Sequence, residues 1–455
     1  METKTNKLIE KYNVAGPRYT SYPTVPYWQE NLTAKQWIQL LKQTFNESNF
    51  TEGISLYIHL PFCESLCTYC GCNKHITKNH AVEQPHINFI LKEWQLYVQL
   101  LAQKPIIKEL HLGGGTPTFF SPQNLKYLIE NIAQSAVIAP NAELSFEAHP
   151  GNTTLNHLDV LHQLGFSRIS LGVQDFNPIV QKAIHRIQSY EQVVEATENA
   201  RKSNYHSVNF DLIYGLPFQT IDSMVETINK TIQLRPERIA LYSYAHIPWL
   251  KPSQRGYDEN DLPIPKTKRL LYEVGKDLLL NAGYVEIGMD HFALKTDNLY
   301  TAMQRKKLHR NFMGYTNAHT KLMIGLGVSS ISDSWNAFAQ NVKTVKEYES
   351  LLNQNQLPFL KGHELTQEDL IIRKHILNIM CHFETDWSMP VDYCNHIAEA
   401  VKKLKELVID GLILFTENGL KVTQKGVPFV RNICMAFDAH LLRKAPQTNL
   451  FSSTV

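Results

Sequence analysis

Four of the seven cysteines in the 455-residue chain lie within one short segment. Cys63, Cys67 and Cys70 are spaced Cys-x3-Cys-x2-Cys, and Cys72 follows two residues later. Three thiolates at this spacing can hold three irons of a four-iron, four-sulfur cluster, whereas such clusters usually take four cysteines. The remaining iron has no protein ligand, and an open position is typical of a catalytic metal site. The spacing therefore predicts a reactive iron–sulfur centre with Cys63, Cys67 and Cys70 as metal ligands.

A disulfide and a zinc site are the alternative uses of clustered cysteines. The other three cysteines are scattered along the chain, and residues 1–7 do not resemble a signal peptide. We therefore expect a reducing, cytoplasmic compartment, where clustered cysteines more often bind metal than form disulfides. Cys67-x2-Cys70 alone would suit zinc, but a closed zinc site needs a second ligand pair. His75 and His80 follow the loop without completing such a pair, so zinc is the less favoured interpretation.

Composition limits the class of protein. Hydrophobic residues make up 43% of the chain and charged residues 19%, and the formal net charge is +2 with the basic residues dispersed. These values indicate a globular enzyme of two or three domains and give no nucleic-acid footprint. No apolar run of the sequence approaches the length of a membrane span.

From residue 54 to about 285 the chain alternates two patterns. Short β-branched or aliphatic runs end near His59, Leu112, Phe146, Val173, Ile213 and Tyr244. Amphipathic helical stretches are predicted at 84–102, 122–134, 154–164, 190–203, 220–234 and 266–282. This alternation predicts an α/β fold of parallel strands with right-handed crossovers. Six units are too few for a closed eight-fold barrel, so we expect an open partial barrel, with a doubly wound sheet as the alternative.

Cysteine, glycine and polar residues follow the carboxyl ends of these predicted strands. Active sites of parallel α/β folds lie at these strand ends. The cysteine loop follows the first strand, and the glycines at 113–115 follow the second. Bare glycines let a ligand approach the backbone, and their amides can bind its carboxylate or pack on its flat parts. Glu147, Gln174 and Asp211 lie at the ends of the next three strands, and Tyr242-Ser243-Tyr244-Ala245-His246 closes the sixth.

Two acids at these strand ends are candidates for ligand contacts. Glu147 and Asp211 each emerge from an apolar strand, and a buried carboxylate needs a cationic or hydrogen-bonding partner. An acid at Asp211 could hold a ribose hydroxyl. Tyr57 and His59, two residues apart, face the same side of the first strand, with core packing as the alternative role.

The cysteine spacing resembles the signature of the radical S-adenosylmethionine superfamily. Further motifs are similar to those of one of its families, the oxygen-independent coproporphyrinogen III oxidases (dehydrogenases). They include Cys-Gly-Cys-Asn at 70–73, Gly-Val-Gln-Asp-Phe at 172–176, Gly-Met-Asp-His-Phe-Ala at 288–293, His-Arg-Asn-Phe at 309–312, and the segments 13–24 and 431–438. Their order along the chain makes chance similarity implausible.

The resemblance implies a (β/α)6 partial TIM barrel with an N-terminal arm and a mostly helical C-terminal domain. The expected divisions are 1–50 for the arm and a leading helix, 51–300 for the barrel, and 301–455 for a winged-helix-like cap. It also implies two S-adenosylmethionine molecules per active site beside a [4Fe-4S] cluster. Positions matching the contacts of the cluster-coordinated molecule are Tyr57, Gly114, Glu147 and Ile331. Positions matching the contacts of the second are Tyr69, Gly115, Thr116, Gln174, Arg186, Asp211 and Ala245.

Tyr57 and Cys72 are the positions that the resemblance marks as catalytic. Cys72 resembles a cysteine that the family needs for turnover but does not use as a ligand. The alternative is that Cys72 is a fourth ligand, which would close the cluster.

The implied activity is the oxidative decarboxylation of two propionates of coproporphyrinogen III to vinyl groups, giving protoporphyrinogen IX. A 5′-deoxyadenosyl radical removes a hydrogen atom from each propionate. The resemblance implies an electron donor of flavodoxin or ferredoxin type and a monomer, with neither nucleic acid nor a membrane span. The four carboxylates of the substrate need guanidinium partners, and Arg18, Arg255 or Arg310 are the hypothesised ones. Residues 19–28 are either a lid or a structural strap.

Two other functions share the superfamily's cluster. One is a haem-binding chaperone, which usually lacks the equivalent of Cys72 and the N-terminal arm; the other is a methyltransferase that opens the haem ring. Several positions depart from the family's usual pattern and bear on substrate recognition. They are Leu112, His149, Gly151, Met313 and the stretch 317–322.

Overall fold

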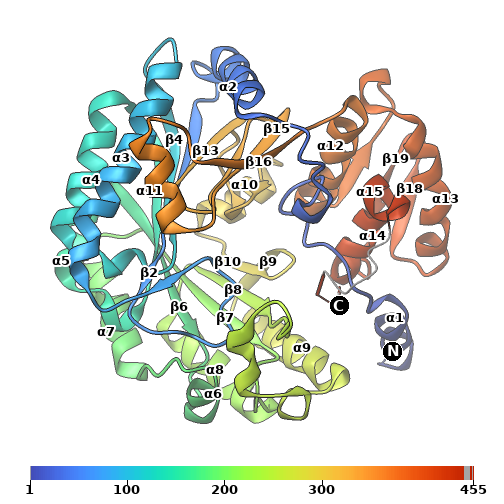
Figure 1. The fold of residues 1–455 in the computed structure, drawn as a ribbon. Helices are drawn as coiled ribbons and strands as arrows, with labels where there is room; N and C mark the ends of the chain where they lie inside the picture. Colours follow the sequence, from blue (N-terminus) through green and yellow to red (C-terminus); the bar gives the residue numbers. More distant parts are fainter. Residues whose placement is uncertain (1, 445–450, 453, 455) are drawn as a thin grey trace.

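A computed structural model describes residues 2–444, 451, 452 and 454, and across these residues one twelve-stranded sheet is the centre of the fold (Figure 1). Its middle strands are parallel and follow one another in chain order: β1 (Ile54–Leu60), β4 (Ile106–Gly114), β5 (Val137–Ala148), β6 (Phe166–Gln174), β7 (Ser207–Tyr214) and β8 (Arg238–Ser243). A doubly wound sheet would reverse its strand order at a switch point. The sequential order without closure confirms the predicted partial barrel.

The helices that connect these strands cover the outside of the sheet (Figure 1). They are α3 (Glu83–Leu100), α4 (Pro122–Ser135), α5 (Leu155–Gln163), the short α6 (Pro178–Ala183), α7 (Tyr190–Lys202), α8 (Ile221–Leu234) and α9 (Pro265–Asn281). Hydroxyl side chains cap several of them: Ser121, Thr154, Ser189 and Thr220 each accept a hydrogen bond from an amide of the first turn. These caps mark the starts of α4, α5, α7 and α8, and there the predicted and observed starts agree within one residue.

Six further strands extend the sheet at its two edges. Beyond β1 lie β13 (Leu322–Leu326), β14 (Ile331–Asp333), β15 (Ala337–Asn341) and β16 (Phe359–Glu364), and beyond β8 lie β10 (His291–Leu294) and β9 (Tyr284–Gly288). β13 is parallel to β1, whereas the others pair antiparallel. The sheet therefore continues beyond residue 300, where we predicted the end of the barrel, because β13 to β16 belong to it. The division into domains stays a prediction.

Short elements complete this part of the chain. They are β2 (Phe62–Cys63), β3 (His75–Ile76), α10 (Asn298–Gln304), the hairpin β11 (His309–Asn311) and β12 (Gly314–Thr316), and α11 (Val345–Asn353).

The C-terminal part is mostly helical, as expected. α12 (Gln367–His382) and α13 (Asn395–Ile409) precede the hairpin β18 (Ile413–Thr416) and β19 (Gly419–Val422), to which β17 (Glu384–Asp386) adds a third strand. α14 (Val430–Phe437) and α15 (Ala439–Arg443) follow. Glu417 and Asn418 join the two strands of the β18–β19 hairpin. Within the described residues no helix has both the length and the apolar character that a bilayer span requires.

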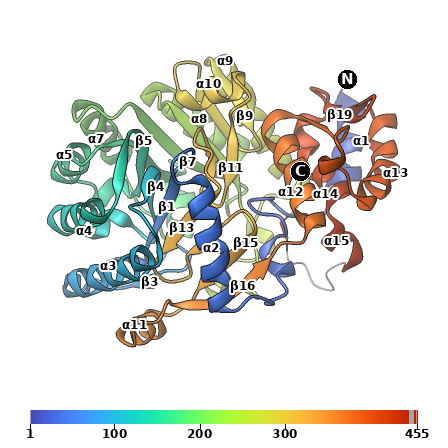
Figure 2. The ribbon, with the colours of Figure 1, turned by 90° about the horizontal axis from the view of Figure 1, so that it is seen from above.

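The N-terminal arm joins the two parts. α1 (Glu2–Tyr12) lies beside the C-terminal helices, whereas α2 (Ala34–Ser48) packs on the sheet near β13 and β15 (Figure 2). Between them, buried Tyr19 donates a hydrogen bond to Asp438 Oδ2 at 3.0 Å, and the ring of Trp28 stacks on Phe338 of β15 with centroids 5.2 Å apart. These contacts favour the structural strap over the lid for residues 19–28.

The ion pair of Arg373 with Asp333 links α12 to β14. Both side chains are buried, and the guanidinium also stacks on Trp335 at 4.2 Å and donates to the Trp335 carbonyl at 2.8 Å. We predict that Arg373→Ala lowers the free energy of unfolding by about 3–5 kcal/mol, because it leaves a buried carboxylate without its cation. Urea denaturation monitored by circular dichroism measures this loss.

The matched control is Arg443→Ala on α15, whose ion pair with Glu368 is half-exposed and should contribute at most about 1 kcal/mol. Equal losses in the two variants would show that the buried pair does not hold the C-terminal helices to the sheet.

Candidate active site

The cysteine loop is fixed at its base by main-chain hydrogen bonds. β2 pairs in parallel with β3, so that the His75 amide donates to the Pro61 carbonyl at 2.7 Å and the Thr77 amide to the Cys63 carbonyl at 2.9 Å. This pairing closes the loop that carries Cys67 and Cys70 directly after strand β1.

Side chains from other loops brace its outer part. The Thr68 amide donates to the Ile184 carbonyl at 3.0 Å, and Ser253 Oγ donates to the Thr68 carbonyl at 3.1 Å. Lys251 Nζ donates to the Gly71 carbonyl at 2.7 Å. The loop is thus held from three sides, and the positions of its sulfur atoms depend on several distant segments of the chain.

Polar and cationic groups face the thiols. Thr116 Oγ1 donates to Cys63 Sγ at 3.4 Å, and Arg186 Nη1 lies 3.7 Å from Cys67 Sγ. A hydrogen bond from Cys72 lowers the pKa of the Cys70 thiol to about 6. Burial raises the pKa of the Cys63 thiol to about 11 despite the Thr116 hydrogen bond, so these surroundings favour the metal-binding thiolate at Cys70 but not at Cys63.

The spacing of the sulfur atoms separates a cluster from a single ion. In the described part of the chain, His363, Asp369 and His440 are the group of possible ligands whose atoms all lie within 4.8 Å of one another. The three thiols of the loop do not form such a group, whereas a tetrahedral zinc would hold sulfur atoms about 3.8 Å apart. The arrangement of the three thiols therefore does not match a single zinc ion, and the cluster ligands stay a prediction.

A cavity of about 450 Å³ lies at the carboxyl ends of the strands, beside the cysteine loop. It brings together most of the predicted site residues: Cys63, Cys67, Tyr69, Cys70, Cys72, Gly114, Gly115, Thr116, Glu147, Gln174, Arg186 and Asp211. His149, one of the departures from the family pattern, also lines it. The convergence of these side chains at one edge follows from the parallel register of β1 to β8.

Three predicted residues lie outside the wall of this cavity, and their roles stay predictions. Tyr57 is behind it, with its hydroxyl 3.0 Å from His59 Nδ1 and its ring stacked on His111. Ile331 starts β14 and packs beside Trp28 and Phe338. The Ala245 carbonyl accepts a hydrogen bond from Gln254 at 3.2 Å.

The glycine segment provides close packing rather than free amides. The Gly114 amide donates to Glu147 Oε2 at 3.2 Å, and the Gly115 amide donates to the Leu60 carbonyl at 2.8 Å. A Cβ on Gly115 would lie 2.7 Å from the Pro61 carbonyl, and Gly114 has a φ of 114°. Side chains are therefore excluded here, and because these two amides already have partners within the protein, the glycines fit packing against the flat part of a ligand better than binding of its carboxylate.

Asp211 is a buried acid whose side chain is fixed by two hydrogen bonds at the wall of the cavity. Ser170 Oγ donates to its Oδ2 at 2.8 Å and Asn209 Nδ2 donates to its Oδ1 at 3.0 Å, while burial raises its pKa to about 6. Sequence reasoning missed Ser170 and Asn209. Ser170 stands two residues before Gly172 on β6, and this period-two spacing is the signal that places it on the inner face.

Arg186 is a cation that can donate one more hydrogen bond than it makes within the described residues. Its guanidinium donates to the Gly172 carbonyl and approaches Cys67, but its buried Nε has no hydrogen-bond partner among the described residues. A Cβ on Gly172 would lie 2.8 Å from the same guanidinium. The unsatisfied donor beside the cavity fits an anionic or polar group of a bound ligand.

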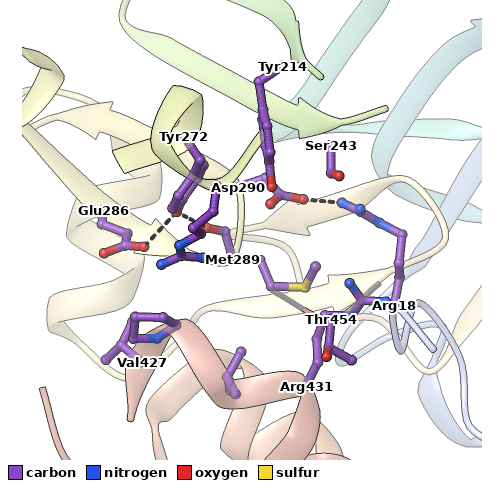
Figure 3. A pocket seen from close by; sticks show the side chains of 13 residues that line it. Arg18, Tyr214, Ser243, Tyr272, Glu286, Met289, Asp290, Val427, Arg431 and Thr454 are labelled. Carbon is purple, nitrogen blue, oxygen red and sulfur yellow. Dashed lines mark hydrogen bonds and ion pairs between the residues drawn. The ribbon is translucent and has the colours of Figure 1, made fainter. Parts of the chain in front are cut away.

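The three arginines proposed for substrate binding differ in their surroundings. Arg255 is exposed and donates to the Pro248 carbonyl. Arg18 forms an ion pair with Asp290 beside a small cavity of about 40 Å³ between the barrel and α14, where Arg431 also lies (Figure 3). Arg310 is buried over the ring of Tyr315, and its Nε and Nη1 have no hydrogen-bond partner among the described residues.

A deeper cavity of about 70 Å³ continues the active-site cavity into the barrel. The two share Glu147, Ser170, Asp211 and Tyr242 in their walls, and Met313, His291 and Tyr315 line the deeper part. Arg310 packs 4.9 Å from the ring centroid of Tyr315, which lines this deeper part, whereas Arg168 and Arg238 are the arginines in its wall.

Comparison with known proteins agrees with this site. The family model of the Radical SAM superfamily matches residues 57–231, which span β1 to α8. A partial barrel with a three-cysteine loop after its first strand defines a protein of the radical SAM class.

The chain is 38% identical over 459 residues to the oxygen-independent coproporphyrinogen III oxidase of Synechocystis sp., covering 99% of this chain and 97% of the relative. It is 37% identical to the Escherichia coli enzyme of the same name, covering 96% of each chain. The solved structure of coproporphyrinogen III oxidase from Escherichia coli, a radical SAM enzyme, matches with a TM-score of 0.88 and 36% identity, covering 96% of this chain and 99% of that one. The chain belongs to the family of oxygen-independent coproporphyrinogen III oxidases.

Substitution of single cysteines tests the ligand set. We predict that Cys67→Ala loses most of its bound iron after anaerobic reconstitution, whereas Cys72→Ala keeps it, because only the former removes a ligand. Iron and sulfide analysis with electron paramagnetic resonance of the reduced protein measures the difference. Loss of the cluster in Cys72→Ala would instead show a fourth protein ligand and a closed site.

Proposed function

We propose that the protein catalyses the oxygen-independent oxidative decarboxylation of two propionates of coproporphyrinogen III, giving protoporphyrinogen IX in haem biosynthesis. The observation that carries this proposal is the cavity at the strand ends, where three thiols, Glu147, Arg186 and Asp211 converge in a chain that matches the family over nearly its full length. The reaction requires a cluster with an open iron, a second cofactor beside it, and enclosure from water.

The residues fit both groups. Cys63, Cys67 and Cys70 would hold a [4Fe-4S] cluster, and the cavity beside them has room and hydrogen-bonding groups for S-adenosylmethionine. When bound, the cluster and S-adenosylmethionine supply a carbon-centred radical that takes a hydrogen atom from the substrate. The substrate radical then releases carbon dioxide and gives one electron to an external acceptor. These two losses leave the vinyl group.

We propose two S-adenosylmethionine molecules per active site. Tyr57, Gly114, Glu147 and Ile331 would surround the molecule on the cluster. Tyr69, Gly115, Thr116, Gln174, Arg186, Asp211 and Ala245 would surround the second. The support is that Arg186 and Asp211 lie in the same cavity and each offers a polar group suited to a ligand.

Arg310 is the arginine that we propose for a substrate carboxylate. Its Nε and Nη1 are buried without hydrogen-bond partners in the described chain, which is costly unless a ligand completes them. Arg18 already faces a carboxylate in Asp290, and Arg255 points to solvent. We further propose that the protein acts as a monomer in the cytoplasm with a small protein as electron donor.

The direct test is turnover by anaerobically reconstituted protein with coproporphyrinogen III, S-adenosylmethionine and a strong reductant. We predict release of carbon dioxide and 5′-deoxyadenosine, with conversion to a two-vinyl product, because the proposed site would place the cluster, S-adenosylmethionine and the substrate next to one another. Stable haem binding without decarboxylation would support the haem-chaperone alternative, and transfer of a methyl group would support the methyltransferase.

Two arginine variants serve as a matched pair in the same assay. Arg310→Met should raise KM for coproporphyrinogen at least about tenfold, as expected for the loss of a charged hydrogen bond of about 1.5–3 kcal/mol. Arg255→Met should leave KM unchanged. Equal KM values in both variants would contradict the role of Arg310.

The raised pKa of Asp211 predicts a pH dependence for cofactor binding. Below pH of about 6 this carboxylate becomes protonated and loses acceptor capacity, so affinity for the second S-adenosylmethionine should fall as the pH decreases through this value. Anaerobic isothermal titration calorimetry between about pH 5 and pH 8 should give two molecules per chain, one of them pH-dependent. Asp211→Asn should weaken that one site and remove its pH dependence. A wild-type stoichiometry of one at every pH would disprove the second site.

A further inference from the structure

The outer surface over the cysteine loop has an unusual charge. Three segments meet there, at residues 63–80, 178–188 and 247–256, and together they contain six Lys or Arg but one Asp or Glu. The chain as a whole has 45 Lys or Arg and 43 Asp or Glu. The cations are Lys74, Lys78, Lys182, Lys251 and Arg255, together with Arg186, whose guanidinium faces inward to Cys67, and the single acid is Glu64. The positive charge is confined to these three segments, because Asp258, Glu259 and Asp261 follow directly after the third.

The same segments expose large apolar side chains. Ile187 is 79% exposed, Ile179 63%, Leu250 56% and Trp249 54%. Exposed apolar residues grouped within a rim of charges are typical of protein interaction sites. Together with Lys182 and Arg255, these four residues define what we term the docking face.

The docking face lies against the metal ligands. Thr68, between Cys67 and Tyr69, is hydrogen-bonded on one side to Ile184 and on the other to Ser253, so both apolar segments adjoin the cysteine loop directly. Arg186, one residue before Ile187, reaches Cys67 Sγ at 3.7 Å. Buried Val180, Ile184, Tyr244 and Tyr257 pack together beneath the face and fix α6 and the loop after β8 relative to each other.

We propose that the docking face binds the protein that delivers electrons to the cluster, and that this partner is a small, acidic, low-potential one-electron carrier. This inference rests on the proposed function, which requires one electron per radical generated. In each encounter the carrier is oxidised by one electron and the cluster is reduced by one. The positive rim complements an acidic carrier and raises its association rate, while the apolar side chains give the short-lived contact typical of electron-transfer complexes.

The test is the rate of cluster reduction, followed by absorbance in a stopped-flow instrument under anaerobic conditions. The probe is a purified, fully reduced flavodoxin, which is acidic and carries one electron at a time. For the wild-type protein the second-order rate constant should decrease steeply as ionic strength rises. A rate that does not depend on salt would overturn the proposal without any variant.

Two variants locate the contact. Lys182→Glu and Ile187→Ser lie on the docking face, and neither side chain lines the active-site cavity. We expect each to lower the rate constant at low salt about tenfold or more, and to weaken binding of oxidised flavodoxin in calorimetry. Reduction by dithionite and iron content should not change, which shows that folding and the cluster are intact.

Lys402→Glu and Ile409→Ser on α13 are the matched controls, since Lys402 is exposed and Ile409 is 84% exposed. They should behave as the wild-type protein does. The proposal is wrong if the docking-face variants are reduced as fast as the wild type, or if the α13 variants are slowed equally. Because no porphyrin is present, the result does not depend on whether the substrate has been identified correctly.

Discussion

The parallel pairing of β1 with β4 is the interaction on which the rest of the site depends. Its register sets His59 opposite Gly113 and Leu60 opposite Gly114, so the cysteine loop leaves β1 beside the glycine segment that leaves β4. The absence of side chains on Gly114 and Gly115 lets the two segments touch, and the amides of Gly115 and Thr116 then bond to the Leu60 and Phe62 carbonyls. A Cβ on Gly115 would collide with the Pro61 and Phe62 main chain and so displace the loop that carries the proposed cluster ligands, whereas a Cβ on Gly114 would collide with the His59 ring.

The remaining strands extend this arrangement around the cavity. Glu147 on β5 lies opposite Ser170 on β6, and Gly172 on β6 lies opposite Asp211 on β7. Neighbouring strands therefore contribute polar side chains to the same edge, and Gly172 leaves space beside Asp211. The apolar faces of the strands, with Leu56, Ile58 and Phe146 fully buried, hold the register that makes this possible.

Much of this could be predicted from the sequence, because the signals are local. The six parallel strands follow from alternating patterns and hydroxyl caps, and the metal ligands follow from the spacing of three cysteines. The edge strands β13 to β16 were not predicted, since strands as short as Ile331–Asp333 have no periodicity to detect. The sequence does not reveal tertiary contacts such as the hydrogen bond from the Gly114 amide to Glu147. Nor does it reveal that Arg18 pairs with Asp290 while Arg310 has two donors without hydrogen-bond partners among the described residues.

We propose that one iron of the cluster is left open for S-adenosylmethionine, and electron–nuclear double resonance on the reduced, anaerobic protein measures whether it is. With S-adenosylmethionine labelled in its amino nitrogen and carboxylate oxygen, both labels should show hyperfine coupling to a single iron. Absence of coupling to either label, with all irons carrying protein ligands, would show that the cluster is closed.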